Sequence, residues 1–263
     1  MIYISDALVL TETVLAVSLN NSRIGYKSIA TGRTPVASSS VSGYPASAAA
    51  TFTTYDYWRP AAMPATWAID ATDDVECDYV GMVGDIEARS IAVQYSFDNI
   101  NWLTAFEFIA EKKVVMGLFE SRTGRYWRVL INGSVPNVSV IYIGKALEMQ
   151  RSIYQGHSPV TLSRTTEISS NVSEGGQYLG RSIIRNGSAT SAQFQNLRAE
   201  WYRENFDPFV KAARTQPFFF AWRPLKFPQE VGYVWTSEDI QPSNSGPRDF
   251  MSVSFSMSGI GVD

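Results

Sequence analysis

The stretch that decides the fold spans residues 173–261 and has the sequence SEGGQYLGRSIIRNGSATSAQFQNLRAEWYRENFDPFVKAARTQPFFFAWRPLKFPQEVGYVWTSEDIQPSNSGPRDFMSVSFSMSGIG. Gly175-Gly176 opens it, and Asn186-Gly187 is a strong turn dipeptide, which predicts a hairpin that returns along residues 188–195. A helix is predicted next, and Asp207-Pro208 should kink it, because proline lacks the backbone N–H. The apolar positions at helical spacing are Leu197, Trp201, Tyr202, Phe206, Phe209, Val210 and Ala213.

Three strands are predicted after the helix. Residues 217–222 form an apolar run suited to a buried strand, and residues 231–235 are its expected partner. Residues 250–258 alternate serine with apolar side chains, as a half-buried strand does. The predicted order is therefore β-β-α-β-β with a closing strand.

That order resembles the split-barrel fold shared by the tail-tube and distal-tail proteins of long-tailed bacteriophages. In those proteins a sheet and one flanking helix build a ring-forming unit. The resemblance covers roughly the last third of the chain and implies that Asn186, Gly187, Leu197, Trp201 and Phe206 belong to the ring-forming hairpin and helix. The same order of elements also occurs in unrelated α+β domains.

Composition limits the class of protein. The 263 residues suffice for two modest domains, each with its own core. Charged residues make up 18%, below the ~25% of typical globular proteins, and aromatic residues make up 13%. This balance indicates a β-rich protein or one that hides surface in an assembly. The net charge of −3 argues against a DNA-binding groove, and 16 Arg against 6 Lys fits paired or interfacial sites.

Compartment signals are few. The single cysteine, Cys77, excludes an intrachain disulfide and is expected to be a buried or inert thiol. Residues 7–10 and 14–19 are apolar, but Glu12 interrupts them and no positively charged segment precedes them, so we expect no signal peptide. No run approaches the ~18–20 apolar residues of a membrane span. A protein made in the cytosol, without membrane contact, is expected.

The chain divides into four predicted parts. These are an N-terminal arm and linker (1–49), a β-sandwich (50–148), a connector (149–172) and the tail-tube-like domain (173–263). Residues 2–18 have strand-like content, and residues 28–50 are rich in small and polar residues and predict a loop that buries little surface. The arm is expected either to add a strand to the C-terminal sheet or to reach a neighbouring subunit. The connector holds the sole histidine, His157, expected to be a turn residue.

The sandwich is predicted from short strands at regular intervals with turn residues between them and no helix. The segments are residues 65–70, 75–83, 90–96, 124–131 and 138–144.

Residues 50–148 resemble a galactose-binding-like (discoidin-like) jelly-roll domain. The phrases that carry the resemblance are WAID at 67–70, VQYSFDNINW at 93–102, RYWRV at 125–129 and IYIG at 141–144. Phage-tail and adhesion proteins carry such domains, as do many secreted enzymes. The fold class is thus mainly β: a galactose-binding-like β-sandwich plus a tail-tube-like β-barrel or sheet domain with one helix.

Catalytic motifs are missing from the sequence. His157 is the only imidazole, there is no G-x-S-x-G motif, and no His/Cys spacing suits a metal. Gly175-Gly176 precedes a predicted strand, so it is no phosphate loop. We expect a protein that is not an enzyme and takes no cofactor.

One acidic stretch is a candidate metal site. Asp70, Asp73 and Asp74, close to Glu76 and Asp78, could offer several oxygens to Ca²⁺, which some galactose-binding-like domains bind. The alternative is a solvated acidic loop between two strands.

An aromatic loop is the candidate contact site. Tyr55, Tyr57, Trp58 and Arg59 suit a carbohydrate or a partner protein, because aromatic faces stack on sugar rings and anchor interfaces. The alternative is that these aromatic residues form the core and rim of the sandwich.

Together these features predict a structural virion protein of a tailed phage, the ring-forming distal tail protein that links the tail tube to the baseplate or tail tip. The expected partners are further copies in a homohexameric ring, the tail tube protein, and baseplate hub or tail-tip proteins. DNA would pass through the lumen without specific binding, because a basic lumen would hold the polyanion. The expected location is the virion tail, after synthesis in the host cytoplasm. The alternative is an adhesion protein whose sandwich binds host glycans, and an enzyme with an accessory module is disfavoured by the missing catalytic groups.

Overall fold

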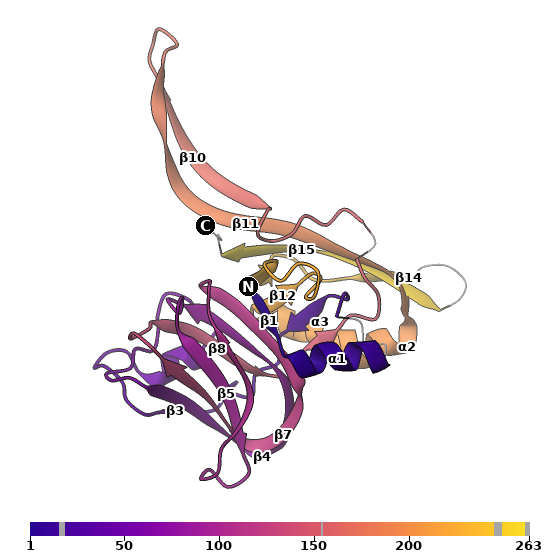
Figure 1. Ribbon diagram of the computed structural model, residues 1–263. Helices are drawn as coiled ribbons and strands as arrows, with labels where there is room; N and C mark the ends of the chain where they lie inside the picture. The colour runs from indigo at the N-terminus through magenta and orange to yellow at the C-terminus, as the bar shows by residue number, and fades with distance from the viewer. Residues whose placement is uncertain (16–18, 154, 245–248, 261–263) are drawn as a thin grey trace.

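The computed structural model describes residues 1–15, 19–153, 155–244 and 249–260 and shows a mainly β chain built from two sheets (Figure 1). The predicted fold class, mainly β with a β-sandwich, is confirmed. Residues 16–18 of the predicted apolar segment 14–19, and residues 245–248 and 261 of the stretch 173–261, lie outside the described residues. The predicted domain boundaries stay predictions.

The first sheet forms a sandwich because two of its strands are long enough to serve both layers. Strands β4 (Ala65–Gly84) and β7 (Val114–Asn132) pair antiparallel, with register shifts between Asp70 and Val75 and between Cys77 and Tyr79. The first half of β4 pairs with β3 and the second half with β8, while β7 also pairs with β5 and β1. The remaining strands are β1 (Ile2–Ile4), β3 (Val36–Ala37), β5 (Ser90–Ser96), β6 (Leu103–Ile109) and β8 (Val138–Gly144).

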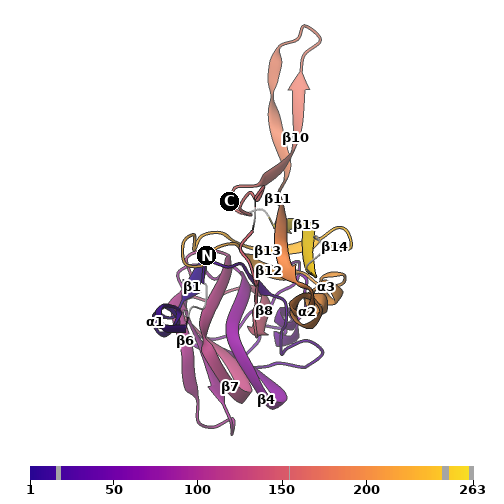
Figure 2. The ribbon, with the colours of Figure 1, turned by 90° about the vertical axis from the view of Figure 1, so that its right-hand side faces the viewer.

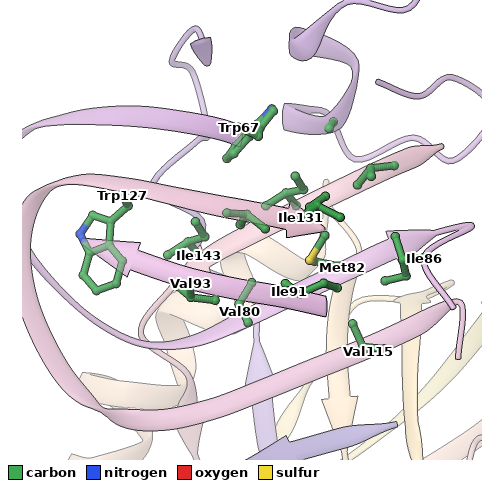
Figure 3. Close-up of a cluster of buried hydrophobic side chains, with 14 of the residues drawn as sticks. Trp67, Val80, Met82, Ile86, Ile91, Val93, Val115, Trp127, Ile131 and Ile143 are labelled. Carbon is green, nitrogen blue, oxygen red and sulfur yellow. The ribbon is translucent and has the colours of Figure 1, made fainter. Parts of the chain in front are cut away.

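The sandwich core follows from the alternation in these strands. Every second side chain points inward, so Trp67 and Ile69 of β4 meet Trp127 and Val129 of β7 in a fully buried cluster. Figure 3 shows these layers closing around Val80, Met82, Val93 and Ile143.

The segment 28–50 contributes to this core, contrary to the prediction that it buries little surface. Ala30 and Ala49 belong to the cluster, and Ala48 is also buried; the last two lie on a short 3₁₀ helix, Ala46–Ala50. Small side chains allow the backbone to lie close against the sheet. The prediction from composition alone did not include this effect.

The N-terminus also differs from the prediction. Ile2–Ile4 is a strand, parallel to β7, but Asp6–Leu15 is a helix, α1, rather than a strand. The Ser5 hydroxyl accepts the Leu8 N–H at 3.2 Å, and Asp6 lies in the first turn, both favourable at a helix start. Among the described residues, no helix is long and apolar enough to span a membrane.

The second sheet has the order β10-β11-β15-β13-β12-β2-β9, with β14 against β15. Strands β12 (Phe218–Ala221), β13 (Val231–Thr236) and β15 (Phe250–Ile260) lie where the sequence predicts strands, and β12 pairs with β13 as expected. Strand β2 (Arg23–Gly25) pairs with β12, so the N-terminal arm adds a strand to the C-terminal sheet. The others are β9 (Leu147–Glu148), β10 (Arg164–Val172), β11 (Tyr178–Arg198) and β14 (Pro242–Asn244).

The hairpin of this sheet turns at a different place from the predicted one. The Ser173 N–H donates to the Gln177 carbonyl at 2.9 Å, and Gly176 has a φ of 78°, so the turn is the Gly-Gly segment. Asn186-Gly187 lies inside β11, and β10, from the predicted connector, is the other arm. Gly187 serves close approach instead: a Cβ there would lie 3.0 Å from Thr165 Oγ1.

The predicted helix is present and irregular. It runs through α2 (Ala199–Trp201), a π-helical turn (Tyr202–Phe206) and α3 (Asp207–Ala213). The irregularity comes just before Pro208, whose missing N–H cannot complete a regular ladder. Leu197, assigned to the helix by its spacing, lies in β11.

The two sheets meet through an aromatic interface. Phe219 of β12 packs against Tyr142 of β8 at 5.4 Å and against Tyr233 of β13 at 5.0 Å between ring centroids. The Tyr142 hydroxyl donates to the Pro217 carbonyl at 3.1 Å. Gly81 of β4 lies directly against Phe219, because a Cβ at Gly81 would approach its ring to 2.4 Å.

The interface predicts that Gly81→Ala destabilises the protein. An added methyl group must displace the buried Phe219 ring, so we expect a loss of about 1 to 3 kcal/mol in the free energy of unfolding, measured by urea denaturation. Gly175→Ala is the matched control, because its Cβ would meet only Ser173 Oγ, at 3.9 Å. Equal stability of the two variants would contradict this interface.

Candidate functional site

The aromatic loop keeps only part of its predicted contact surface. Tyr55 is 84% exposed and Arg59 is exposed, whereas Tyr57 is half-buried and stacks on Tyr44 at 4.7 Å. Trp58 is 0% exposed, and its indole N–H contacts the Ser39 carbonyl and the Ser40 hydroxyl, both at 3.1 Å. The prediction of Trp58 as a contact residue is therefore wrong, because this ring belongs to the sandwich core.

A pocket at the base of the hairpin brings two predicted groups together. Tyr55 lines this pocket of about 660 Å³ with Trp235, and so do Asn186 and Gly187 of β11. No local pattern indicated that the aromatic loop would lie beside the Asn-Gly segment, since more than a hundred residues separate them. Of the other predicted ring residues, Leu197 and Phe206 are buried in the core of the second sheet.

The acidic stretch forms an ion pair rather than a metal site. Both carboxylate oxygens of Asp70 accept hydrogen bonds from the Arg125 guanidinium at 2.8 Å, which lowers the pKa of Asp70 to about 2. Asp73 and Asp74 are exposed. Within the described residues, no group of three or more His, Cys, Asp or Glu side chains could hold a metal ion. The alternative, a solvated acidic loop between two strands, also differs from the structure, because residues 70–78 lie within β4, where its register shifts between Asp70 and Val75.

A second pocket, which we call the junction pocket, lies between the sandwich, the β2–β9 edge and the helix. Its volume is about 570 Å³. Arg23 of β2 is 8% exposed and its Nη1 lies 2.7 Å from Glu148 of β9. Asp78 of β4 accepts the Ala146 N–H at 2.7 Å, and burial raises its pKa to about 6. The other lining residues are Asn21, Tyr26, Lys27, Lys145, Leu147, Met149, Gln150, Trp201, Glu204 and Asn205.

The sequence indicated Asp78 only as part of the acidic stretch and Trp201 only as part of the predicted helix. Nothing in the sequence indicated Arg23. These side chains come from residues far apart in the chain and form no motif. The only related signal was the excess of Arg over Lys, which pointed to paired arginines without locating them.

The hairpin β10–β11 stands clear of the body in both views (Figures 1 and 2). All nine residues of β10 are exposed. Among the described residues, β11 pairs with β15 from Gly187 onward, residues 178–185 pair with β10 alone, and β10 has an open outer edge. Its exposed apolar side chains are Ile168, Val172, Tyr178, Leu179, Ile183 and Ile184.

Comparisons with known proteins give structural neighbours only. No protein-family model and no curated protein matches the chain. Chitosan-binding module 1 of a chitosanase/glucanase from Paenibacillus sp. IK-5 is 20% identical; the match covers 44% of this chain and 98% of the module, with a TM-score of 0.40. Module 2 of that enzyme, in complex with chitotriose, is 17% identical over 44% of this chain and 98% of the module, with a TM-score of 0.41.

A third neighbour is the CBM32 module of AlyQ in complex with 4,5-unsaturated mannuronic acid. It is 12% identical over 45% of this chain and 96% of the module, with a TM-score of 0.40. These neighbours are carbohydrate-binding modules, the kind of domain to which the galactose-binding-like resemblance also points. None of the three is a phage tail protein.

Asp78 predicts how stability depends on pH. Its pKa is about 6 in the folded chain against an ordinary 3.8, so between these values the folded state binds more protons than the unfolded state. Stability therefore falls as pH rises from about 4 to 6. Asp78→Asn keeps an acceptor for the Ala146 N–H and should raise the free energy of unfolding near pH 8 by about 1 to 3 kcal/mol, converging with the wild type near pH 4.

Urea denaturation at several pH values measures this difference. Asp74→Asn is the control, because Asp74 is exposed and its replacement should leave the pH profile unchanged. An Asp78→Asn variant that is less stable than the wild type at every pH would show that the carboxylate is stabilising rather than costly.

Proposed function

We propose that the protein is a structural subunit that assembles with further copies of itself through the β10–β11 hairpin. The observation that carries this proposal is a two-stranded hairpin that projects from the body and whose outer part, residues 164–172 and 178–185, has no further strand on either edge among the described residues. An isolated two-stranded hairpin is marginally stable in water, and its open edges are templates for another strand. A partner that pairs with these edges supplies the missing stabilisation.

The partner we propose is another copy of this chain. The hairpin carries apolar side chains near its turn, Val172, Tyr178 and Leu179, and one ion pair, Glu167–Arg185 at 2.9 Å. Every copy offers the same open strands, so pairing can repeat from one copy to the next, and a head-to-tail repeat that closes on itself gives a ring. The low charged fraction of 18% fits a chain that covers surface in an assembly.

The place we propose for this ring is the tail of a bacteriophage, as the distal tail protein between the tail tube and the baseplate or tail tip. The support is the order of elements from β10 to β15, two strands, a helix and then further strands, which resembles the ring-forming unit of tail-tube and distal-tail proteins. A net charge of −3 suits a lumen through which DNA passes without specific binding. The role is mechanical, with no catalysis and no cofactor, in a virion made in the host cytoplasm.

Carbohydrate binding is the second candidate function. The observation that favours it is the Tyr55 ring, 84% exposed beside the exposed Arg59 on a loop of the sandwich. An exposed aromatic face can stack on a sugar ring, and a guanidinium can donate to sugar hydroxyls. The two functions are compatible, because the loop and the hairpin turn are different parts of the surface.

Removal of the hairpin tests the assembly function. Thr165 and Gly187 are paired residues, so joining them through Asn-Gly deletes residues 166–186 and closes a two-residue turn. We expect native mass spectrometry and negative-stain imaging to show a ring of about six copies for the full chain and a monomer for the shortened chain.

A point variant gives the matched comparison. Ile168→Ser with Ile183→Ser changes a cross-strand pair on the hairpin and should weaken assembly, whereas Ile109→Ser, at an equally exposed position of the sandwich, should not. A full-length chain that stays monomeric at high concentration and forms no ring in purified tails would overturn the proposal.

A glycan array tests the second candidate. For any glycan that the wild type binds on the array, Tyr55→Ala should lower the affinity by about tenfold, the loss expected from one stacked ring. The control is Ile109→Ser, at an exposed position of the sandwich. An aromatic control such as Tyr95→Ala is unsuitable, because the Tyr95 ring packs on the core residue Trp127. Equal binding by the wild type and Tyr55→Ala would remove this loop from the function.

A further inference from the structure

The junction pocket has no role in the functions above. It is built from three parts of the chain: Asp78 and Lys145 beside the sandwich, Arg23 and Glu148 on the edge of the second sheet, and Trp201 on the helix. Its volume of about 570 Å³ lies within the range of small-molecule sites. No single layer of the protein could form it alone.

The charges around the pocket balance. Three acidic and three basic side chains line it, so an anion would meet carboxylates and a cation would meet ammonium or guanidinium groups. A ligand that is uncharged and rich in hydroxyl groups avoids both penalties. The six charged residues are Arg23, Lys27, Asp78, Lys145, Glu148 and Glu204.

Arg23 supplies an unpartnered buried donor. Its side chain is 9% exposed, its Nη1 is held by Glu148 at 2.7 Å, and its Nε has no hydrogen-bond partner in the described part of the chain. A buried donor without an acceptor is unfavourable, and native proteins rarely leave one. A ligand hydroxyl oxygen that reaches Nε would satisfy it.

Asp78 supplies the complementary acceptor. Oδ1 accepts the Ala146 N–H at 2.7 Å, and no hydrogen bond joins Oδ2 to another described residue. Arg23 and Asp78 both line the pocket. A donor and an acceptor in one pocket match a hydroxyl group, which both donates and accepts.

Trp201 supplies the aromatic surface. It is partly buried against the core of the second sheet and lines the pocket from the helix. Flat, weakly polar C–H faces of sugar rings pack against aromatic side chains while their hydroxyl groups require polar partners. The pocket offers both kinds of surface.

We infer that the junction pocket binds a neutral saccharide unit, with the sugar ring against Trp201 and its hydroxyl groups paired with Arg23 and Asp78. This inference rests on the second proposed function, carbohydrate binding, and adds to the Tyr55 loop a second site at the junction of the two sheets. It is independent of assembly through the hairpin.

The experiment uses the full chain and saturation-transfer NMR with free glucose, galactose, mannose and N-acetylglucosamine and their β-1,4-linked disaccharides, up to about 20 mM, which detects a millimolar Kd. Trp201→Leu removes the aromatic surface, and Asp78→Asn exchanges the carboxylate acceptor for an amide of about the same size. Glu200→Ala is the matched control, because Glu200 is exposed on the same helix but does not line the pocket.

We expect the wild type to bind at least one sugar, Trp201→Leu and Asp78→Asn to lose at least tenfold in affinity, and Glu200→Ala to retain it. Binding lost in Tyr55→Ala but kept in both pocket variants would overturn the junction site while supporting carbohydrate binding by the loop. Failure of the wild type to bind any sugar of the panel would overturn the junction site, and loss of all glycans on the array as well would remove carbohydrate binding altogether. Neither result touches the ring, which is measured by mass.

Discussion

The packing of Phe219 over Gly81 is the contact on which the rest of the structure depends. The outward face of the β8–β4–β7 layer and the β12–β13 strands meet there in a cluster of buried apolar and tyrosine side chains. Tyr142 and Tyr233 enclose the Phe219 ring, and the Tyr233 hydroxyl reaches the Phe52 carbonyl at 2.9 Å. Because such an interface is close-packed, it fixes the two sheets relative to each other. The direction of the hairpin and the shape of both pockets follow from it.

The close packing of this interface also explains the unusual environment of two polar groups at its margin, Asp78 and Arg23. Asp78 precedes Tyr79, a fully buried member of the apolar cluster. The Asp78 carboxyl is therefore buried as well, and burial raises its pKa to about 6. Arg23 sits across the junction, on a strand that the N-terminal arm adds to the second sheet. The proposed functions are therefore located at the junction pocket between the two sheets and at the β10–β11 hairpin, and not within the core of either sheet.

Much of the fold was predictable because alternation and apolar runs are local. The strands β12, β13 and β15, and the sandwich strands around Trp67 and Trp127, appear where the pattern indicates them. The prediction of a turn at Asn186-Gly187 was wrong. A turn dipeptide has only a local preference, and the pairing of β11 with both β10 and β15 outweighs that preference. Trp58 was misplaced because composition cannot tell a rim aromatic residue from a core one. The junction pocket was out of reach, since only the tertiary fold brings residues 23, 78, 148 and 201 together.

The central claim is that the β10–β11 hairpin is an assembly element, and amide hydrogen exchange across protein concentration tests it most directly. In a lone subunit the outward-pointing amides of β10 and of residues 178–185 have no partner strand and should exchange quickly. The account predicts that these amides, and not those of the sandwich, become protected as the protein assembles. An assembled state in which the hairpin amides still exchange at the rate of the dilute protein would contradict it.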